Sequence, residues 1–186
     1  MAQTPNDTVV YKPTIEGLFV RGMKGLLPSD TLRELQSVGL DLSRPLRDTY
    51  PATMVAQAIE IAGKALAPTG DLEQRWYAVG KRVVPGVRET ALGTAVLAFA
   101  KLVGPQSALQ RMPSIVKSTS NYLEAVVKPV GARCHDLEIT GSLGPASYLQ
   151  AVVEDILLIA GAANLSVRAT SVDAQHHRVV YRVTWG

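Results

Sequence analysis

Cysteine, aromatic residues and long apolar segments are all scarce in this chain of 186 residues. The single cysteine, Cys134, excludes a disulfide within one chain and is typical of a reducing compartment. The opening segment "MAQTPNDTVVYKP" lacks the basic start and apolar centre of a signal peptide. The two longest apolar stretches are interrupted by Lys101 and by Glu154–Asp155, so both fall short of the ~20 apolar residues that span a bilayer. We therefore expect a cytoplasmic protein without a membrane span.

Strong charge of either sign is also missing. The formal net charge is +3, and the basic side chains are scattered among acidic ones rather than gathered in a stripe. A nucleic-acid-binding surface usually shows such a stripe, so we expect no nucleic-acid partner. Hydrophobic residues make up 47% of the chain, which is enough for a folded core. The length suits one domain, and we expect a flexible arm over residues 1–13 followed by a single domain over residues 14–186.

Helical patterns dominate the first two thirds of the sequence. Residues 14–27 contain three glycines and predict a short strand or an irregular entry. Apolar residues then recur at the helical period between proline, glycine and serine or aspartate boundaries. Helices are expected over residues 29–38, 72–84, 87–104 and 105–120, with Asp71 as a cap, and residues 41–66 are expected to be helical with Pro45 and Pro51 each in a first turn. Pro85–Gly86 is expected to break the pattern, and Pro113 marks either a kink or a boundary.

The last third alternates like β-strands around one further helix. "NYLEAVVKPVGARCHDLEITG" predicts a hairpin around "PVG", and a wide apolar stripe predicts a helix over residues 145–162. "NLSVRATSV" and "RVVYRVTW" predict a second hairpin, joined by "DAQHH". Hairpin, helix and hairpin in this order predict a four-stranded antiparallel sheet covered by the N-terminal helices, an α+β domain.

Several phrases in this order resemble a known family. They are "IEGLFVRGMKGLL", "PSDTLRELQSVGLDLSRPLRDTYPATM", "DLEQRWYAVGKRVV", "YLEAVVKPVGARCHDLEITG" and the closing "AGAANLSVRATSVDAQHHRVVYRVTW". The chain resembles, over residues 14–186, a myxobacteria-restricted family of unknown function that is related to the 4-vinyl reductase domain. The resemblance implies the ligand-binding fold named after NO signalling and Golgi transport. It also implies a sensory or ligand-binding role, often as a dimer, and sometimes with a bound hydrophobic molecule.

One departure from that family limits what can be transferred. Relatives with the 4-vinyl reductase domain often carry cysteines in a turn before the final strand, whereas this chain reads "SVDAQHHRVVYRV" there. Any metal or redox role of those cysteines is therefore not transferred.

The histidines and the cysteine do not form an evident reactive site. His176 and His177 are adjacent and point to opposite faces of an extended chain, so we expect them to be solvated turn residues. A zinc site needs three or four ligands. A cluster of Cys134, His135 and His177 would form only if the two turns meet, and a nucleophilic Cys134 would need a base on its own face. We expect Cys134 to be a half-buried strand residue, and we expect neither a metal nor a cofactor.

The remaining candidates for catalysis have structural explanations. Glu154 and Asp155 diverge by about 100° on a helix and do not make an acid/base pair, so we expect Glu154 to be exposed or paired with an arginine. The glycine phrases "GLFVRGMKG" and "GSLGPA" do not match a phosphate loop. No nucleophile with a base and an orienting group is present, so we do not expect an enzyme.

Two functions then stay open. The first is binding of a small, hydrophobic molecule in an apolar pocket between the helices and the sheet. The candidate lining residues are Met54, Trp76, Leu97, Phe99, Leu157, Tyr181 and Trp185, and for the aromatic residues among them core packing is the alternative. The second is a protein–protein interaction module, expected to be a homodimer. The small residues of "TALGTAVLAFA" would let another helix approach closely, either from the same chain or from a second copy.

Overall fold

The computed structural model describes residues 8–186, and of residues 91 and 92 only the backbone. The N-terminal elements are β1 (Val9–Tyr11), α1 (Lys12–Ile15), the π-helix η2 (Glu16–Gly22), α2 (Ser29–Ser37), β2 (Thr49–Pro51) and α3 (Ala52–Leu66). The middle of the chain forms α4 (Leu72–Arg88), α5 (Ala91–Gln110) and α6 (Met112–Thr119). The C-terminal elements are β3 (Glu124–Gly131), β4 (Cys134–Thr140), α7 (Ala146–Ile159), β5 (Ser166–Asp173) and β6 (Arg178–Thr184). The predicted α+β class is confirmed.

The C-terminal strands form one antiparallel sheet in the order β3-β4-β6-β5. Strand β3 pairs with β4 and strand β5 pairs with β6, so each hairpin forms as predicted. The two hairpins are joined by the pairing of β4 with β6, in which Leu137 lies opposite Tyr181. The histidine pair lies in the turn between β5 and β6, as predicted. The predicted four-stranded sheet built from hairpin, helix and hairpin is therefore confirmed.

The two faces of this sheet differ because side chains alternate along a strand. The inner face carries the fully buried Leu137, Ile139 and Tyr181. The outer face carries an ion pair between Asp136 and Arg182, with 2.5 Å between the carboxylate oxygen and Nε. The period-two pattern of β4 and β6 thus directs one face to the core and the other to solvent.

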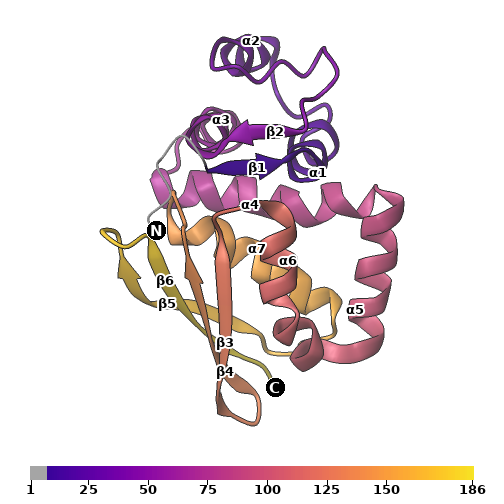
Figure 1. Cartoon of the computed structure of the whole chain (residues 1–186), viewed down its shortest axis with the longest axis vertical. Helices are drawn as coiled ribbons and strands as arrows, with labels where there is room; N and C mark the ends of the chain where they lie inside the picture. Colours follow the sequence, from indigo (N-terminus) through magenta and orange to yellow (C-terminus); the bar gives the residue numbers. More distant parts are fainter. Residues whose placement is uncertain (1–7) are drawn as a thin grey trace.

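Helix α4 runs between the N-terminal elements and the layer formed by α7 and the sheet (Figure 1). Glycines allow the backbones to approach closely on both sides of α4. A Cβ atom at Gly80 would overlap the carbonyl oxygen of Tyr148 on α7, and a Cβ atom at Gly86 would overlap the carbonyl oxygen of Gly17 on η2. Val79 and Val84 belong to two different core clusters, so α4 separates an N-terminal core from a sheet core.

Several predicted boundaries are wrong. Residues 14–22 form the end of α1 and the π-helix η2, where a short strand or an irregular entry was predicted, because the buried Leu18 and Phe19 pack in the N-terminal core, and residues 23–27 are turns. Residues 41–48 contain no helix and residues 49–51 form β2, so the predicted helical stretch begins only at Ala52. Helix α4 continues through Pro85, and the break comes at Thr90, whose Oγ1 accepts a hydrogen bond from the backbone of Gly93 at 2.9 Å. Pro113 lies in the first turn of α6 and therefore marks a boundary rather than a kink.

The expected flexible arm, residues 1–13, falls partly outside the described residues. Within the described part, β1 pairs with β2 and Lys12 begins α1. The division into this arm and a single domain stays a prediction.

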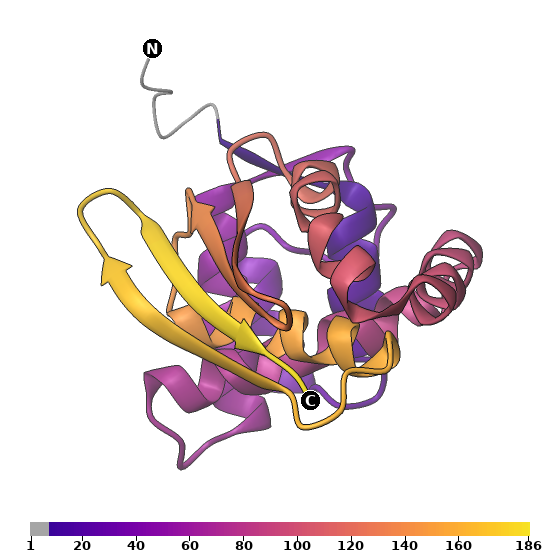
Figure 2. The ribbon, with the colours of Figure 1, turned by 90° about the horizontal axis from the view of Figure 1, so that it is seen from below.

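Helix α5 lies at the edge of the molecule, on the side opposite the β5–β6 hairpin (Figures 1 and 2). Its backbone bends at Gly104, where φ is 79°. In residues 8–186 no single helix meets the length and hydropathy of a membrane span, although the bent pair formed by residues 72–88 and 93–110 meets them together.

Candidate functional site

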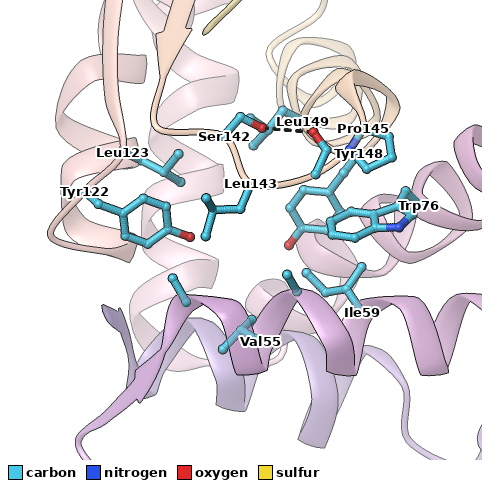
Figure 3. Close-up of a pocket in the computed structure, with 13 residues that line it drawn as sticks. Val55, Ile59, Trp76, Tyr122, Leu123, Ser142, Leu143, Pro145, Tyr148 and Leu149 are labelled. Carbon is cyan, nitrogen blue, oxygen red and sulfur yellow. Dashed lines mark hydrogen bonds between the residues drawn. The ribbon is translucent and has the colours of Figure 1, made fainter. Parts of the chain in front are cut away.

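A cavity of about 50 Å³ lies where α3, α4 and α7 meet the segment before β3. Figure 3 shows its lining, which is apolar apart from a few hydroxyl groups and one indole. The lining residues are Ala52, Val55, Ala56, Ile59, Trp76, Tyr122, Leu123, Ser142, Leu143, Gly144, Pro145, Tyr148 and Leu149. A space of this size holds about three or four water molecules.

Local sequence signals place the walls of this cavity. The capping box of Asp71 and Gln74 begins α4, with the Asp71 side chain accepting from the Gln74 backbone at 2.8 Å. Trp76 follows in the next turn. The loop after β4 ends at Pro145, the N-cap residue of α7, and Tyr148 lies in the first turn of that helix.

Two hydrogen bonds hold the start of α7 in place. The Ser147 hydroxyl donates to the carbonyl oxygen of Glu73 on α4 at 2.8 Å. The buried Tyr181 hydroxyl donates to the carbonyl oxygen of Ala146 at 2.7 Å. The cavity wall formed by α7 is thereby fixed to both α4 and β6.

Trp76 fills much of the space beside the cavity. It is 6% exposed, and its ring meets that of Tyr148 edge-on, with 6.0 Å between the ring centroids and 87° between the planes. A Cβ atom at Gly144 would overlap the indole ring, so the loop backbone lies directly against Trp76. The packing of Trp76 on Gly144 closes the space between α4 and the loop after β4.

Two phenol groups face the cavity. The hydroxyls of Tyr122 and Tyr148 point into the same gap, with Leu143 on one side and α3 on the other (Figure 3). Within residues 8–186 neither hydroxyl has a hydrogen-bond partner. Burial raises the pKa of Tyr122 to about 12, and burial together with the neighbouring Tyr122 raises the pKa of Tyr148. Both groups are therefore neutral at physiological pH.

The structure separates the seven residues that the sequence nominated for ligand binding. Trp76 lines the cavity. Met54 lies on α3 and packs half-buried against the N-terminal core. Phe99 is 42% exposed on α5, with the guanidinium carbon of Arg111 4.5 Å from its ring centroid. The remaining four pack in the sheet core: Leu97, Leu157, Tyr181 and Trp185. A ligand-binding role for the seven stays a prediction.

Tyr122 and Tyr148 were missing from that set. The sequence pattern assigned Tyr122 to a strand and Tyr148 to the apolar stripe of a helix, which are ordinary positions for a ring. A signal was nevertheless available, because a chain with only 5% aromatic residues places one beside the first hairpin and another beside the "GSLGP" turn.

The histidines and Cys134 lie outside the cavity. His176 contacts the Asp173 carboxylate through Nδ1 at 2.7 Å. His135 is 3% exposed on the inner face of the sheet, where its ring stacks on Trp185 at 5.3 Å between centroids. Cys134 is half-buried on the opposite face. No group of three or more histidine, cysteine or carboxylate side chains in the described part of the chain could hold a metal ion.

The carboxylates of α7 behave differently from the prediction. Lys81 of α4 reaches both of them, at 2.6 Å from Asp155 and 3.4 Å from Glu154. The Tyr77 hydroxyl donates to Glu154 at 2.6 Å. The expected exposed or arginine-paired Glu154 is therefore wrong, and the cluster instead joins α4 to α7 by charge and hydrogen bonding.

The fold is that of H-NOX domains. A variant of the Tt H-NOX protein matches with a TM-score of 0.68 and 18% identity, over 94% of each chain. An oxygen-binding H-NOX domain related to soluble guanylate cyclases, in its oxygen complex, matches with a TM-score of 0.60 and 21% identity, over 94% of each chain. A structure concerned with haem distortion in the H-NOX family matches with a TM-score of 0.59 and 21% identity, over 94% of each chain.

The sequence itself identifies the family. Residues 8–186 match the family described as "Protein of unknown function (DUF2378)", and the chain belongs to it. No curated protein matches the chain.

The residues that line this cavity do not fit a haem, the group with which the last of those structures is concerned. Haem iron takes a histidine, cysteine, methionine or tyrosine as its axial ligand. The cavity is lined by no histidine, cysteine or methionine, and by no charged side chain to pair with propionates. Its two tyrosines are protonated, and its volume of about 50 Å³ is far below the ~300 Å³ at the lower end of pockets for drug-sized ligands. The indole of Trp76 and the ring of Tyr148 occupy the adjoining space.

Proposed function

We propose that this protein is a non-catalytic sensory domain that binds a small molecule in the cavity between α3, α4 and α7. The observation that carries the proposal is the pair of unpartnered phenol hydroxyls of Tyr122 and Tyr148, which face one apolar space. Both tyrosines are partly buried, and the Trp76 indole Nε1, which also belongs to the lining, is buried without a hydrogen-bond partner among the described residues. Buried polar groups normally have such partners, so these polar groups around one cavity support a bound molecule or ordered water there. The oxygen-binding H-NOX domain supports the idea that this fold can serve as a binding domain.

The position of the cavity suits a sensor. It is lined from both sides of α4, by α3 on the N-terminal side and by α7 on the side of the sheet. A molecule that contacts both sides would couple them, because binding to one arrangement stabilises that arrangement. The "GSLGP" loop and the start of α7, which line the cavity, would then change position when a molecule binds in it.

Native mass spectrometry of the protein purified from its own host tests this proposal. We expect a bound small molecule that is released on denaturation. Ala56→Leu, which fills the cavity from α3, should abolish it. Ala163→Leu, at an exposed loop position, should retain it. Protein that carries no molecule, and that gains none in a host extract, would contradict the proposal.

The compartment of the protein and the wider relationships of its family are also proposals. We infer a cytoplasmic protein from its single cysteine, and a family that is restricted to myxobacteria and related to the 4-vinyl reductase domain. A survey of genomes and of sequence profiles tests both relationships. Numerous members in unrelated bacteria would overturn the restriction.

A second candidate function is homodimerisation through α5. An apolar helix is normally buried on all sides. Yet Val96, Phe99 and Leu102 are 45%, 42% and 85% exposed. The predicted close approach of a second copy would cover them. We expect sedimentation at micromolar concentration to show a dimer that Leu102→Glu dissociates and Val172→Glu, at another exposed apolar position, leaves intact. A monomeric unaltered protein at micromolar concentration would contradict this candidate.

A further inference from the structure

We propose that the cavity takes an uncharged molecule of about four non-hydrogen atoms whose oxygen or nitrogen hydrogen-bonds to the hydroxyls of Tyr122 and Tyr148. This inference rests on the proposed binding function and adds the chemical class of the ligand. Neither a haem nor a drug-sized molecule enters it.

Size sets the upper limit on this ligand. The cavity volume of about 50 Å³ corresponds to a few water-sized atoms. Trp76 cannot withdraw toward the loop, because its ring already rests on Gly144. Tyr148 is held edge-on against the same indole, and the first turn of α7 is fixed through Ser147. The cavity therefore does not enlarge without displacing several packed groups.

Charge sets the second limit. No lysine, arginine, aspartate or glutamate lines the cavity. Both phenols are neutral at physiological pH, because burial raises their pKa. An ion would lose its hydration and meet no opposite charge, which is costly in an apolar environment. The ligand is therefore neutral.

Hydrogen bonding sets the third limit. Each phenol offers one donor and can also accept. A hydrocarbon in the gap would leave both hydroxyls buried without a partner. A carbonyl, amide or hydroxyl group placed between them satisfies both hydroxyls at once. The remaining surface of such a molecule would contact Val55 and Leu143, which are apolar.

A set of matched probes tests the class directly. Acetamide, acetone, acetate and isobutene share one planar, branched shape and differ only in polarity and charge. Binding is followed by NMR, from the methyl resonances of Val55 and Ile59 in the full chain. Acetamide, acetone and acetate are titrated to about 100 mM and isobutene to its solubility limit, because ligand efficiency limits molecules of this size to a Kd no tighter than ~40 µM and weaker binding requires high concentrations.

The expected order is acetamide and acetone first, isobutene weaker, and acetate without saturable binding. Tyr122→Phe and Tyr148→Phe should each weaken acetamide about five-fold and leave isobutene unchanged or slightly tighter. Ala56→Leu should remove every response, and it keeps the test decisive if a phenylalanine variant fails to fold. Acetate that binds as tightly as acetamide, or acetamide that binds both phenylalanine variants with unchanged affinity, overturns the inference. So does the absence of any response in the unaltered chain.

These outcomes are separate from those of the proposed function. A host molecule recovered by native mass spectrometry that is charged, or much larger than acetamide, would keep the binding function and overturn the class. Unaltered protein that binds acetamide through both phenols while carrying no host molecule would keep the class and count against the function.

Discussion

The indole of Trp76 rests directly on the backbone of Gly144. A Cβ atom at this position would overlap the ring carbons. We expect Gly144→Ala to lower the free energy of unfolding by about 1–3 kcal/mol, because the overlap forces side chains out of their preferred rotamers. Urea unfolding measures the difference. Gly131→Ala is the matched control, since a Cβ atom there would have its nearest neighbour at 3.6 Å. Equal effects of the two substitutions would show that the Trp76 contact is not tight.

The ammonium of Lys81 holds two carboxylates of α7 together. The side chains of Glu154 and Asp155 are only 18% and 20% exposed, so Lys81→Met would leave two mostly buried carboxylates without their cation, although Glu154 keeps its hydrogen bond from Tyr77. We expect a loss of about 1–3 kcal/mol in unfolding free energy. Lys64→Met removes a surface pair with Glu60, whose atoms are 3.6 Å apart, and should cost less than about 0.5 kcal/mol. A loss no larger than that of Lys64→Met would contradict the assigned role.

Alkaline pH should destabilise the protein through its buried phenols. The pKa of Tyr122 rises from the ordinary value of 10.0 to about 12 on folding. The folded state therefore holds the proton more tightly, so this stability is complete below pH 10 and is lost as pH rises through 12. For Tyr122 the loss is at most about 3 kcal/mol. Tyr122→Phe should flatten this part of the stability profile, measured by urea unfolding at a series of pH values. Parallel profiles for the two proteins would count against burial of this hydroxyl.

Haem should not form a stoichiometric complex with this chain. The cavity lacks a histidine, cysteine or methionine, and packed rings occupy the space beside it. We expect that protein mixed with ferric haem and passed through gel filtration shows no Soret band at a one-to-one ratio, and that haem does not raise its Tm. An H-NOX domain that binds haem is the positive control. A one-to-one complex that survives gel filtration would show that α4 and α7 can separate.

Much of the fold could be predicted because local patterns agree with their surroundings. Apolar and polar residues alternate along β4 and β6, and this pattern predicts a strand with one buried face. Leu137 and Tyr181 lie on that buried face of the sheet. The boundaries were harder, because packing overrode local signals. Pro85 stays inside α4, and residues 16–22 adopt a π-helix whose Leu18 and Phe19 enter the N-terminal core.

The site could be predicted only in part. Trp76 was nominated as a large ring with an apolar helix face, and it does line the cavity. Tyr181 was nominated by the same logic, yet it packs in the sheet core and donates to Ala146. A sequence pattern shows that a ring is buried, but it does not show which of two cores receives it. That choice depends on how α4 separates them.

The sequence by itself determined the α+β class, the two hairpins and the turn that holds His176 and His177, because strand alternation and turn residues act over a few neighbours. Only the tertiary structure decided that Tyr122 and Tyr148 face one cavity and that Trp76 closes its side. Those contacts join segments distant in the chain, and they depend on the close approach of α4 to α7 at Gly80 and of the loop to Trp76 at Gly144. Backbone approach of this kind is set by packing, which no local pattern records.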